Sequence, residues 1–212
     1  MSVIGQPTDW ADLIDPMVPD ILKLLVEAWG QMPPPGPGAK EDDITNELCR
    51  VLRQSRTARE LMFQIQTQFV ELDPMPGEDF GRLDIAFAPL IPREDIYFCV
   101  ECKRLNVIKD GKVRAYAAEY VRLGMMRFIT GQYSKAVRHG GMIAYVLDGR
   151  VPQARNNIAL NIRRRRAALR MTAPAEFLPS TVLKGDDRAR ETHHHRAHET
   201  TLFRIHHLFV AG

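Results

Sequence analysis

The chain has 212 residues, which is enough for one well-buried domain but too few for two domains of ordinary size and a linker. Apolar residues make up 45% of the chain and charged residues 26%, a composition that excludes disorder along its whole length, and the formal net charge of +3 does not by itself select an anionic partner. No apolar run approaches the ~20 residues of a membrane span, and the first residues lack the pattern of a secretory signal, so we expect a cytoplasmic protein with no membrane partner.

The first forty residues contain one predicted helix and one exposed loop. Apolar residues recur at helical spacing in DLIDPMVPDILKLLVEAWGQM, which predicts a short helix over Ile21–Trp29. The sequence PPPGPG at 33–38 then excludes regular structure. We therefore treat 1–40 as an N-terminal helix with a Pro/Gly-rich loop, and 41–212 as the main part of a single globular domain.

A helix and three strands are predicted next. EDDITNELCRVLRQS, which begins at Glu41, has an apolar stripe and acids in its first turn, as in an amphipathic helix. ELMFQIQTQFVEL alternates like a half-buried strand, and a Pro/Gly loop follows at 74–77. RLDIAFA and IYFCVECK are strands joined by PLIPRED, whose prolines favour a turn, so they form a hairpin.

The rest of the chain alternates between helices and strands. Residues 115–140 are predicted to form a long helix or helix pair, GMIAYVLDG a buried strand, PQARNNIALNIRRRRAALR a second helix and TLFRIHHLFVA a closing strand. The order α-β-β-β-α-β-α-β predicts an α/β fold with a mixed central β-sheet flanked by α-helices.

Three charged residues, Asp84, Glu101 and Lys103, lie in the two apolar strands of the hairpin. If its turn is centred within 89–95, Asp84 faces Glu101 across the hairpin, and Lys103 points to the same face as Glu101. Facing carboxylates repel, and Mg²⁺ is commonly held by one or two carboxylates with water and substrate phosphate. Beside such a metal, Lys103 can orient or help to deprotonate a water aimed at phosphorus, so the pattern indicates metal-assisted phosphodiester hydrolysis.

The motifs GRLD and VECK on the two strands of a hairpin resemble the PD-(D/E)xK nuclease superfamily over roughly 41 to 148, although Leu83 stands where the family name has Pro. The resemblance implies a restriction-endonuclease-like core and Mg²⁺ as cofactor, with Mn²⁺ able to substitute. It also implies four catalytic residues, which are Asp84, Glu101, Lys103 and Glu47. The three acids among them would bind the metal, and Glu47 would come from the helix that precedes the strands. Gln132 or Lys135 would match the polar residue that many members carry after the lysine strand.

Basic residues suggest contact with nucleic acid. Lys135 and Arg138 are expected near the proposed site, and Arg163 and Arg164 belong to a run of four arginines that can touch a phosphate backbone. A solvated helix face or a protein interface explains that run equally well. By analogy, the predicted nuclease cuts DNA as the effector of a bacterial restriction or anti-phage defence system, either as a homodimer or with a separate recognition subunit.

The sequence is also compatible with two other functions. One is a catalytically silent nuclease-fold subunit that binds nucleic acid or a partner protein, and the other is a zinc-binding interaction module. Zinc would use Cys99, Cys102 and the histidine-rich segment 193–207, but odd spacing in a strand sends the two thiols to opposite faces.

The three cysteines, Cys49, Cys99 and Cys102, are therefore expected to be reduced core thiols. The histidines of 193–207 are expected at the surface and edge of a closing hairpin, with His206 and His207 facing opposite ways and His195 or His198 as a remaining phosphate or metal contact. The sequence does not distinguish DNA from RNA as the substrate.

Overall fold

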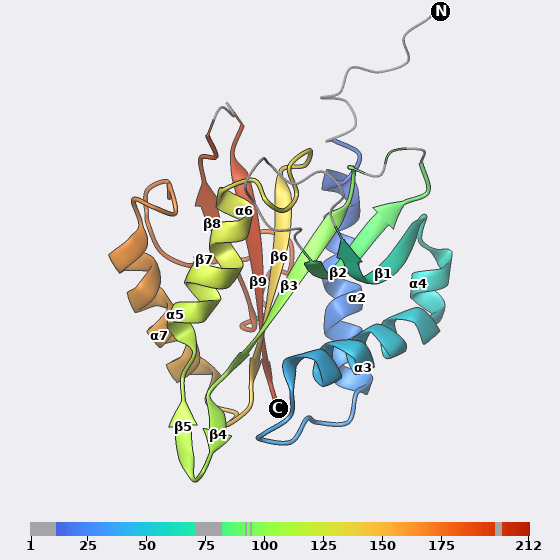
Figure 1. The fold of residues 1–212 in the computed structure, drawn as a ribbon. Helices are drawn as coiled ribbons and strands as arrows, with labels where there is room; N and C mark the ends of the chain where they lie inside the picture. The colour runs from blue at the N-terminus through green and yellow to red at the C-terminus, as the bar shows by residue number, and fades with distance from the viewer. Residues whose placement is uncertain (1–11, 71–81, 92, 94, 198–200) are drawn as a thin grey trace, which may run out of the picture.

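A seven-stranded mixed sheet runs through the centre of the molecule, with helices on both faces (Figure 1). The structure is a computed structural model and describes residues 12–70, 82–91, 93, 95–197 and 201–212. The expected α/β fold with a mixed, helix-flanked sheet is thus confirmed. The predicted loop at 74–77 and His198 lie outside the described residues.

The strand order in the sheet is β1-β2-β3-β6-β9-β8-β7. The bounds are β1 (Phe63–Val70), β2 (Arg82–Pro89), β3 (Phe98–Leu105), β6 (His139–Val146), β7 (Leu178–Pro179), β8 (Ala189–His194) and β9 (Phe203–Ala211). Strands β3, β6 and β9 are parallel, and the pairs on either side of them are antiparallel. A separate ribbon follows β3 and consists of β4 (Val107–Lys109) and β5 (Lys112–Arg114).

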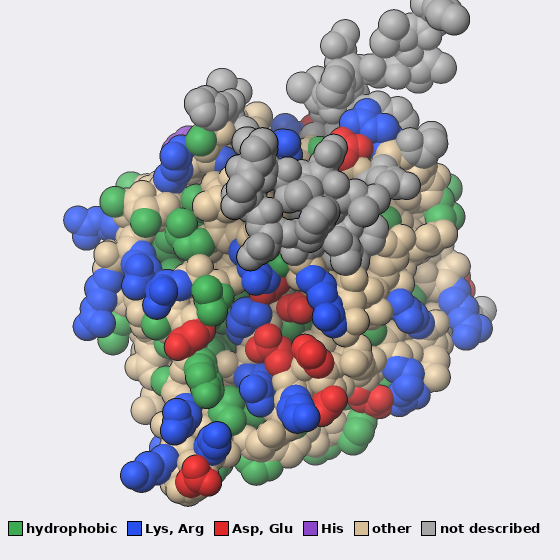
Figure 2. Space-filling view, in the orientation of Figure 1, with side chains coloured by type: hydrophobic (Ala, Val, Ile, Leu, Met, Phe, Trp, Pro, Cys, Tyr) green, Lys and Arg blue, Asp and Glu red, His purple; other side chains and the backbone are tan. Residues whose placement is uncertain are grey.

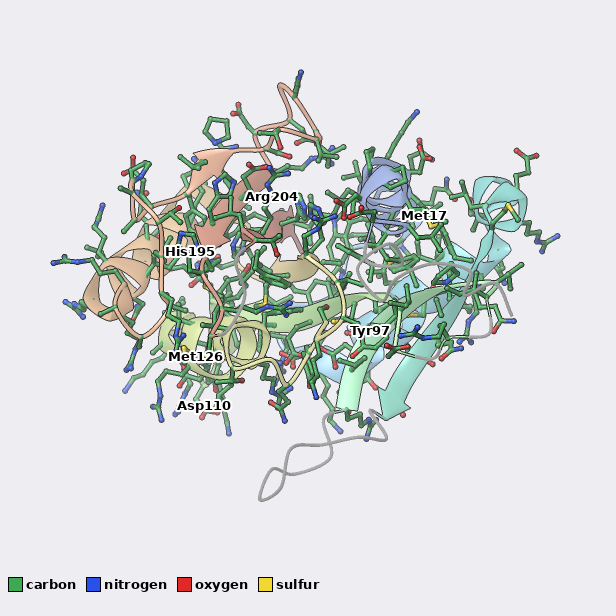
Figure 3. The ribbon with its side chains drawn as sticks, turned by 90° about the horizontal axis from the view of Figure 1, so that it is seen from above. Met17, Tyr97, Asp110, Met126, His195 and Arg204 are labelled. Atoms are coloured by element: carbon green, nitrogen blue, oxygen red, sulfur yellow. The ribbon has the colours of Figure 1, made fainter. Side chains whose placement is uncertain are left out.

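The helices form the two outer layers. Their bounds are η1 (Asp15–Met17), α2 (Val18–Gln31), α3 (Glu41–Gln54), α4 (Arg56–Glu60), α5 (Ala117–Glu119), η2 (Tyr120–Met125), α6 (Met126–Ile129) and α7 (Val151–Arg165). Helices α2 and α3 pack on the face of β3 that presents Phe98, Val100 and Cys102. The continuous helix α5–η2–α6 and helix α7 pack on the other face. Figure 3 shows Met17, next to α2, and Met126, at the start of α6, on opposite sides of the strand layer.

The N-terminal helix belongs to this common core. Trp29 of α2 stacks on Tyr145 of β6 with 5.3 Å between ring centroids, and the buried face of α2 joins the cluster that contains α3 and β3. None of the helices in the described part of the chain combines the length and the apolar character needed to traverse a membrane.

The helix predicted over 115–140 is too long. The helical segment ends at Ile129, and Gly131 follows with φ of +82°, the left-handed conformation that commonly terminates helices. Residues 130–138 form turns, so Gln132 and Lys135 lie in a loop instead of on a helix. Strands β4, β5, β7 and β8 and the short helix α4 were not predicted.

Candidate active site

The hairpin β2–β3 has the register predicted from its sequence. Ile85 pairs with Val100 and Phe87 with Phe98, and the next pair in this register would be Asp84 and Glu101. The ladder stops there, and Asp84 Oδ2 instead accepts a hydrogen bond of 2.7 Å from the backbone N–H of Cys102. The Asp84 side chain is therefore fixed at the point where the two strands separate, beside Glu101.

Lys103 lies between two acids. Its Nζ is 2.7 Å from Glu101 Oε1 and 3.0 Å from Glu41 Oε1, and it donates a further hydrogen bond of 2.9 Å to the carbonyl of Cys102. Glu41 is the first residue of α3, and its other oxygen accepts the backbone N–H of Arg104 at 2.8 Å. Glu101 is only 1% exposed and the Lys103 side chain 16%, so this is a largely buried ion cluster.

Arg127 of α6 reaches the same carboxylate from the helical layer. Its Nη1 is 2.9 Å from Glu101 Oε1 and donates to the hydroxyl of Tyr133 at 2.7 Å, while that hydroxyl donates to the carbonyl of Arg82 at 2.8 Å. Gly124 lets the helix approach the strands, because a Cβ there would lie 2.4 Å from Met142 Cε and 3.8 Å from Glu101 Cγ. Arg127 and Tyr133 thus link the helix, Glu101 and the start of β2.

The electrostatics of the cluster affect each member differently. Burial, and next the charge of Glu101, raise the pKa of Asp84 to about 7, although Lys103 and the Cys102 N–H act in the opposite direction. Burial lowers the pKa of Lys103, but Glu101, Glu41 and Asp84 outweigh it, so the net shift is upward. Lys103 is therefore an ammonium group at neutral pH, suited to orienting a ligand or stabilising negative charge.

Asp84 and Glu101 form a donor set that fits a hard divalent cation. Glu101 Oε2 is buried and has no hydrogen-bond partner among the described residues, which leaves one carboxylate oxygen available as a ligand. The described residues contain no group of three or more His, Cys, Asp or Glu side chains arranged for a metal. Two carboxylates alone suit Mg²⁺, which keeps several waters, better than zinc, which takes three or four protein ligands.

Glu47 does not belong to this cluster. It lies on the outer side of α3, where its Oε2 accepts a hydrogen bond of 2.8 Å from Nε of Arg50. An α-helix turns by about 100° per residue, so Glu41 and Glu47 point in directions roughly 120° apart, and Glu41 is the acid that contacts Lys103. The resemblance implied that Glu47 is the metal-binding acid of this helix, whereas the acid of α3 that lies at the cluster is its first residue, Glu41, which contacts Lys103.

The predicted nucleic-acid contacts are scattered over the molecule. Arg138 pairs with Asp15 at 3.3 Å and with Asp12. Because Lys103 pairs with Ala144, six residues beyond Arg138 in the chain, Arg138 lies about 20 Å along the strand direction from the site. Arg163 and Arg164 are exposed in the last turn of α7, and Gln132 and Lys135 lie in the loop that follows α6.

The cysteines and histidines are mostly core residues. Cys99 contacts Ser134 Oγ at 3.3 Å on one face of the sheet and Cys102 is buried on the other, so the two thiols cannot share a zinc ion. His206 and His207 face opposite ways, as predicted, with His206 bonded to His139 at 3.0 Å and His207 to the Tyr120 hydroxyl at 2.9 Å.

The expected surface position is wrong for His194, His206 and His207, which are all buried, whereas His195 is exposed. These three histidines lie in the hairpin β8–β9. That hairpin is covered by other elements on both of its faces, so the ring nitrogens of these histidines bond to internal groups, except Nδ1 of His206, which has no hydrogen-bond partner among the described residues.

No protein-family model matches this chain, and no curated protein or solved structure matches it either. A function therefore has to follow from the residues of the site. They comprise two facing acids, a lysine and an arginine that both contact one of those acids, and an acid at a helix start that contacts the lysine.

Proposed function

We propose that the protein is a metal-dependent endonuclease of the PD-(D/E)xK class, which hydrolyses phosphodiester bonds in DNA. The main support is that Asp84 and Glu101, on adjacent strands, lie together with Lys103 in a partly buried cluster where one carboxylate oxygen has no protein partner. The order of α3, the antiparallel strands β1-β2-β3, the helix α5–α6 and the parallel strand β6 agrees with a restriction-endonuclease-like core.

Mg²⁺ or Mn²⁺ would be held by Asp84 and Glu101, with the remaining ligands from water and substrate. When bound, such an ion polarises a phosphoryl oxygen and lowers the pKa of a bound water. The two acids also gain from a cation, because their mutual repulsion and burial disfavour the ionised pair.

The positively charged side chains have separate roles in this proposal. Lys103, kept protonated by the surrounding carboxylates, orients the attacking water and stabilises the charge that develops on the phosphate. Glu41 holds the Lys103 ammonium in place, and Arg127, braced by Tyr133, holds the Glu101 carboxylate. Proton removal by Lys103 itself is disfavoured, because three acids raise its pKa.

The surface around the site suits an anionic polymer. Figure 2 shows acidic side chains gathered in the middle of this face, with Lys and Arg side chains around them. A phosphate backbone can contact the surrounding cations while one phosphate reaches the acids through the metal. Cutting both strands takes two sites, so we propose a homodimer or a larger defence complex with a separate recognition subunit.

A cleavage assay with matched variants tests the proposal. Supercoiled plasmid, linear duplex DNA and single-stranded RNA are incubated with Mg²⁺, Mn²⁺ or EDTA and the wild-type protein, Asp84→Ala or Lys103→Ala. Two exposed residues serve as controls, with Asp187→Ala for loss of an acid and Lys184→Ala for loss of a lysine. We expect metal-dependent cutting of DNA that falls by about a hundredfold or more in the two site variants and is unchanged in the controls.

One observation favours a second function. Glu101 Oε1 already contacts both Lys103 and Arg127, so this acid is compensated without a metal. That arrangement also suits a nuclease-fold subunit that binds nucleic acid or a partner protein but does not hydrolyse the substrate. A folded wild-type protein that cuts none of the substrates with any divalent metal would support this function and contradict hydrolysis.

A further inference from the structure

The β4–β5 ribbon projects beyond the lower end of the central sheet, directly after the strand that carries Glu101 and Lys103 (Figure 1). All of its residues from 108 to 114 are exposed. Lys109 pairs with Lys112 across a two-residue loop, and the loop residues Asp110 and Gly111 have φ values of +52° and +70°. Asp-Gly in this conformation forms the tight turn whose twist matches a two-stranded ribbon.

The two faces of the ribbon differ in character. Facing residues of an antiparallel pair lie on the same side, so the register places Ile108 and Val113 on one face and the three cations on the other. Ile108 is 39% exposed and Val113 52% exposed. The other face, called the cationic face here, exposes Lys109, Lys112 and Arg114, and the buried Val107 lies at its base.

No acid among the described residues compensates the charge of the cationic face. Lys109 and Lys112 lie directly opposite each other, an arrangement that destabilises a strand pair. None of the three cations forms an ion pair with an acid in the described part of the chain, and Asp110 is the one acid within the ribbon. A lone two-stranded ribbon is also marginally stable, so these charges carry a cost that an anionic ligand would remove.

The base of the ribbon is fixed relative to the candidate site. Asn106, buried and with φ of +52°, donates from Nδ2 to Asp148 Oδ1 at 3.0 Å. The backbone N–H of Ile108 donates to the carbonyl of Pro37 at 3.2 Å. Lys103 and Lys109 are six residues apart, so at most about 20 Å separates their Cα atoms, which is the length of about six base pairs of duplex DNA.

We propose that the β4–β5 ribbon is a DNA-binding arm, whose cationic face contacts the phosphate backbone of a duplex about half a helical turn from the bond at the candidate site. The two-stranded shape is compatible with this role, since the major groove of DNA admits a β-ribbon. The position of the arm relative to a cut rests on the proposed function, whereas its binding of duplex DNA does not.

Binding is measured without cleavage, so that the arm and the hydrolysis are tested separately. A fluorescent 20-base-pair duplex is titrated by anisotropy in EDTA over a range of salt concentrations. The test variant is Lys109→Ala/Lys112→Ala/Arg114→Ala, and the control Lys23→Ala/Arg59→Ala/Lys184→Ala removes the same three charges from exposed sites elsewhere. Thermal unfolding of both variants checks that each is folded.

We expect the dissociation constant of the arm variant to rise by about tenfold or more, and its salt slope to decrease by about three, because each phosphate contact contributes about 0.9 to the slope. The control should keep the wild-type slope. Equal weakening in both variants would overturn the proposal, as would a wild-type protein that does not bind the duplex. Preference for single-stranded RNA, or for phosphatidylserine vesicles, over the duplex would also overturn it.

The outcomes separate the two proposals. If arm-dependent binding is found in a protein that cuts no DNA, the arm is supported and the hydrolysis fails. If the wild-type protein cuts DNA but the arm variant has the same KM and the same binding as the control, the hydrolysis stands and the arm is rejected.

Discussion

Asp84 accepts the backbone N–H of Cys102 at 2.7 Å, so an acidic side chain takes the place of a ladder partner where β2 and β3 separate. The bond fixes the carboxylate beside Glu101, in surroundings that raise the pKa of Asp84 to about 7. Such an arrangement is unfavourable for the fold when no cation is bound. It is typical of sites where stability is lost in favour of function.

Replacing this acid should stabilise the protein. The folded-state pKa of Asp84 is above its ordinary value of 3.8, so stability is lost as pH rises from about 4 to about 7 and stays low above that. We expect Asp84→Asn to increase the free energy of unfolding by about 2 kcal/mol at pH 8 in EDTA, with no gain below pH 4. Urea unfolding at the two pH values measures the difference.

The exposed Asp95, which pairs with Arg93, supplies the control for this prediction, since the partner lowers the pKa of Asp95. Asp95→Asn should give no gain at pH 8. A loss of stability in Asp84→Asn at pH 8 would show that the Cys102 hydrogen bond outweighs the repulsion. Mg²⁺ should raise the melting temperature of the wild type but not of Asp84→Asn.

Helix α3 offers a matched pair of acids for an activity test. Glu41 contacts Lys103 at 3.0 Å, whereas Glu47 contacts Arg50 on the outer side of the helix. We expect Glu41→Gln to lower the rate of DNA cleavage by about tenfold, because Lys103 loses one of the two carboxylates that hold it, and Glu47→Gln to leave the rate unchanged. The reverse result would assign the metal site to Glu47.

The acids of the candidate site also show what the sequence could and could not predict. The position of Asp84 opposite Glu101 was predictable, because the register of a hairpin follows from the alternation of its side chains and from the length of the loop that joins its two strands. The choice between Glu41 and Glu47 was not, because it depends on how α3 is rotated against the sheet. That rotation is set by packing of Ile44, Leu48 and Leu52 in the core.

Strand β8 was missed for a related reason. Its sequence ARETHH has no apolar alternation, and it forms a strand because pairing with β9 and internal hydrogen bonds satisfy its polar side chains. The ribbon β4–β5 was missed as well, although its Asp-Gly pair is a turn signal that would have located it.

The buried histidines predict acid sensitivity. Burial is the largest cause that lowers the pKa of His139 and His194 to about 4 and that of His206 to about 3. His139 and His206 stack on each other, and the charge of Arg204 also lowers the pKa of both, whereas the charge of Glu191 raises them. A histidine whose folded-state pKa is below 6.5 lowers the free energy of unfolding of the protein as pH falls from 6.5 to 4. We expect a loss of about 2 kcal/mol per histidine over this range.

Asp84 changes stability in the opposite direction over part of the same pH range, so the measurement is best made in the Asp84→Asn background. Urea unfolding between pH 7 and 4 should give a slope that becomes smaller when His206→Gln is added. His195→Gln, at an exposed position, should leave the slope unchanged. A slope that is insensitive to His206→Gln would contradict the assignment.

Gly140 in β6 should not tolerate a side chain. A Cβ at this position would lie 2.5 Å from Cε1 of Phe128, a fully buried aromatic ring of α6. We expect Gly140→Ala to destabilise the protein by about 2 kcal/mol, and Phe128→Leu to restore part of this loss in the double variant. Gly38→Ala, where no atom lies within 4 Å, is the control, and thermal unfolding is the measurement.

The position of β9 has a consequence for how the chain folds during synthesis. Residues 203–211 lie between β6 and β8, so the outer strands β7 and β8 cannot join the sheet until this late segment has left the ribosome. The acids of β2 and β3 are made more than a hundred residues earlier. The nascent protein would therefore carry its site residues on an incomplete sheet, and the contacts between distant segments should make folding slow compared with a helical bundle of this size.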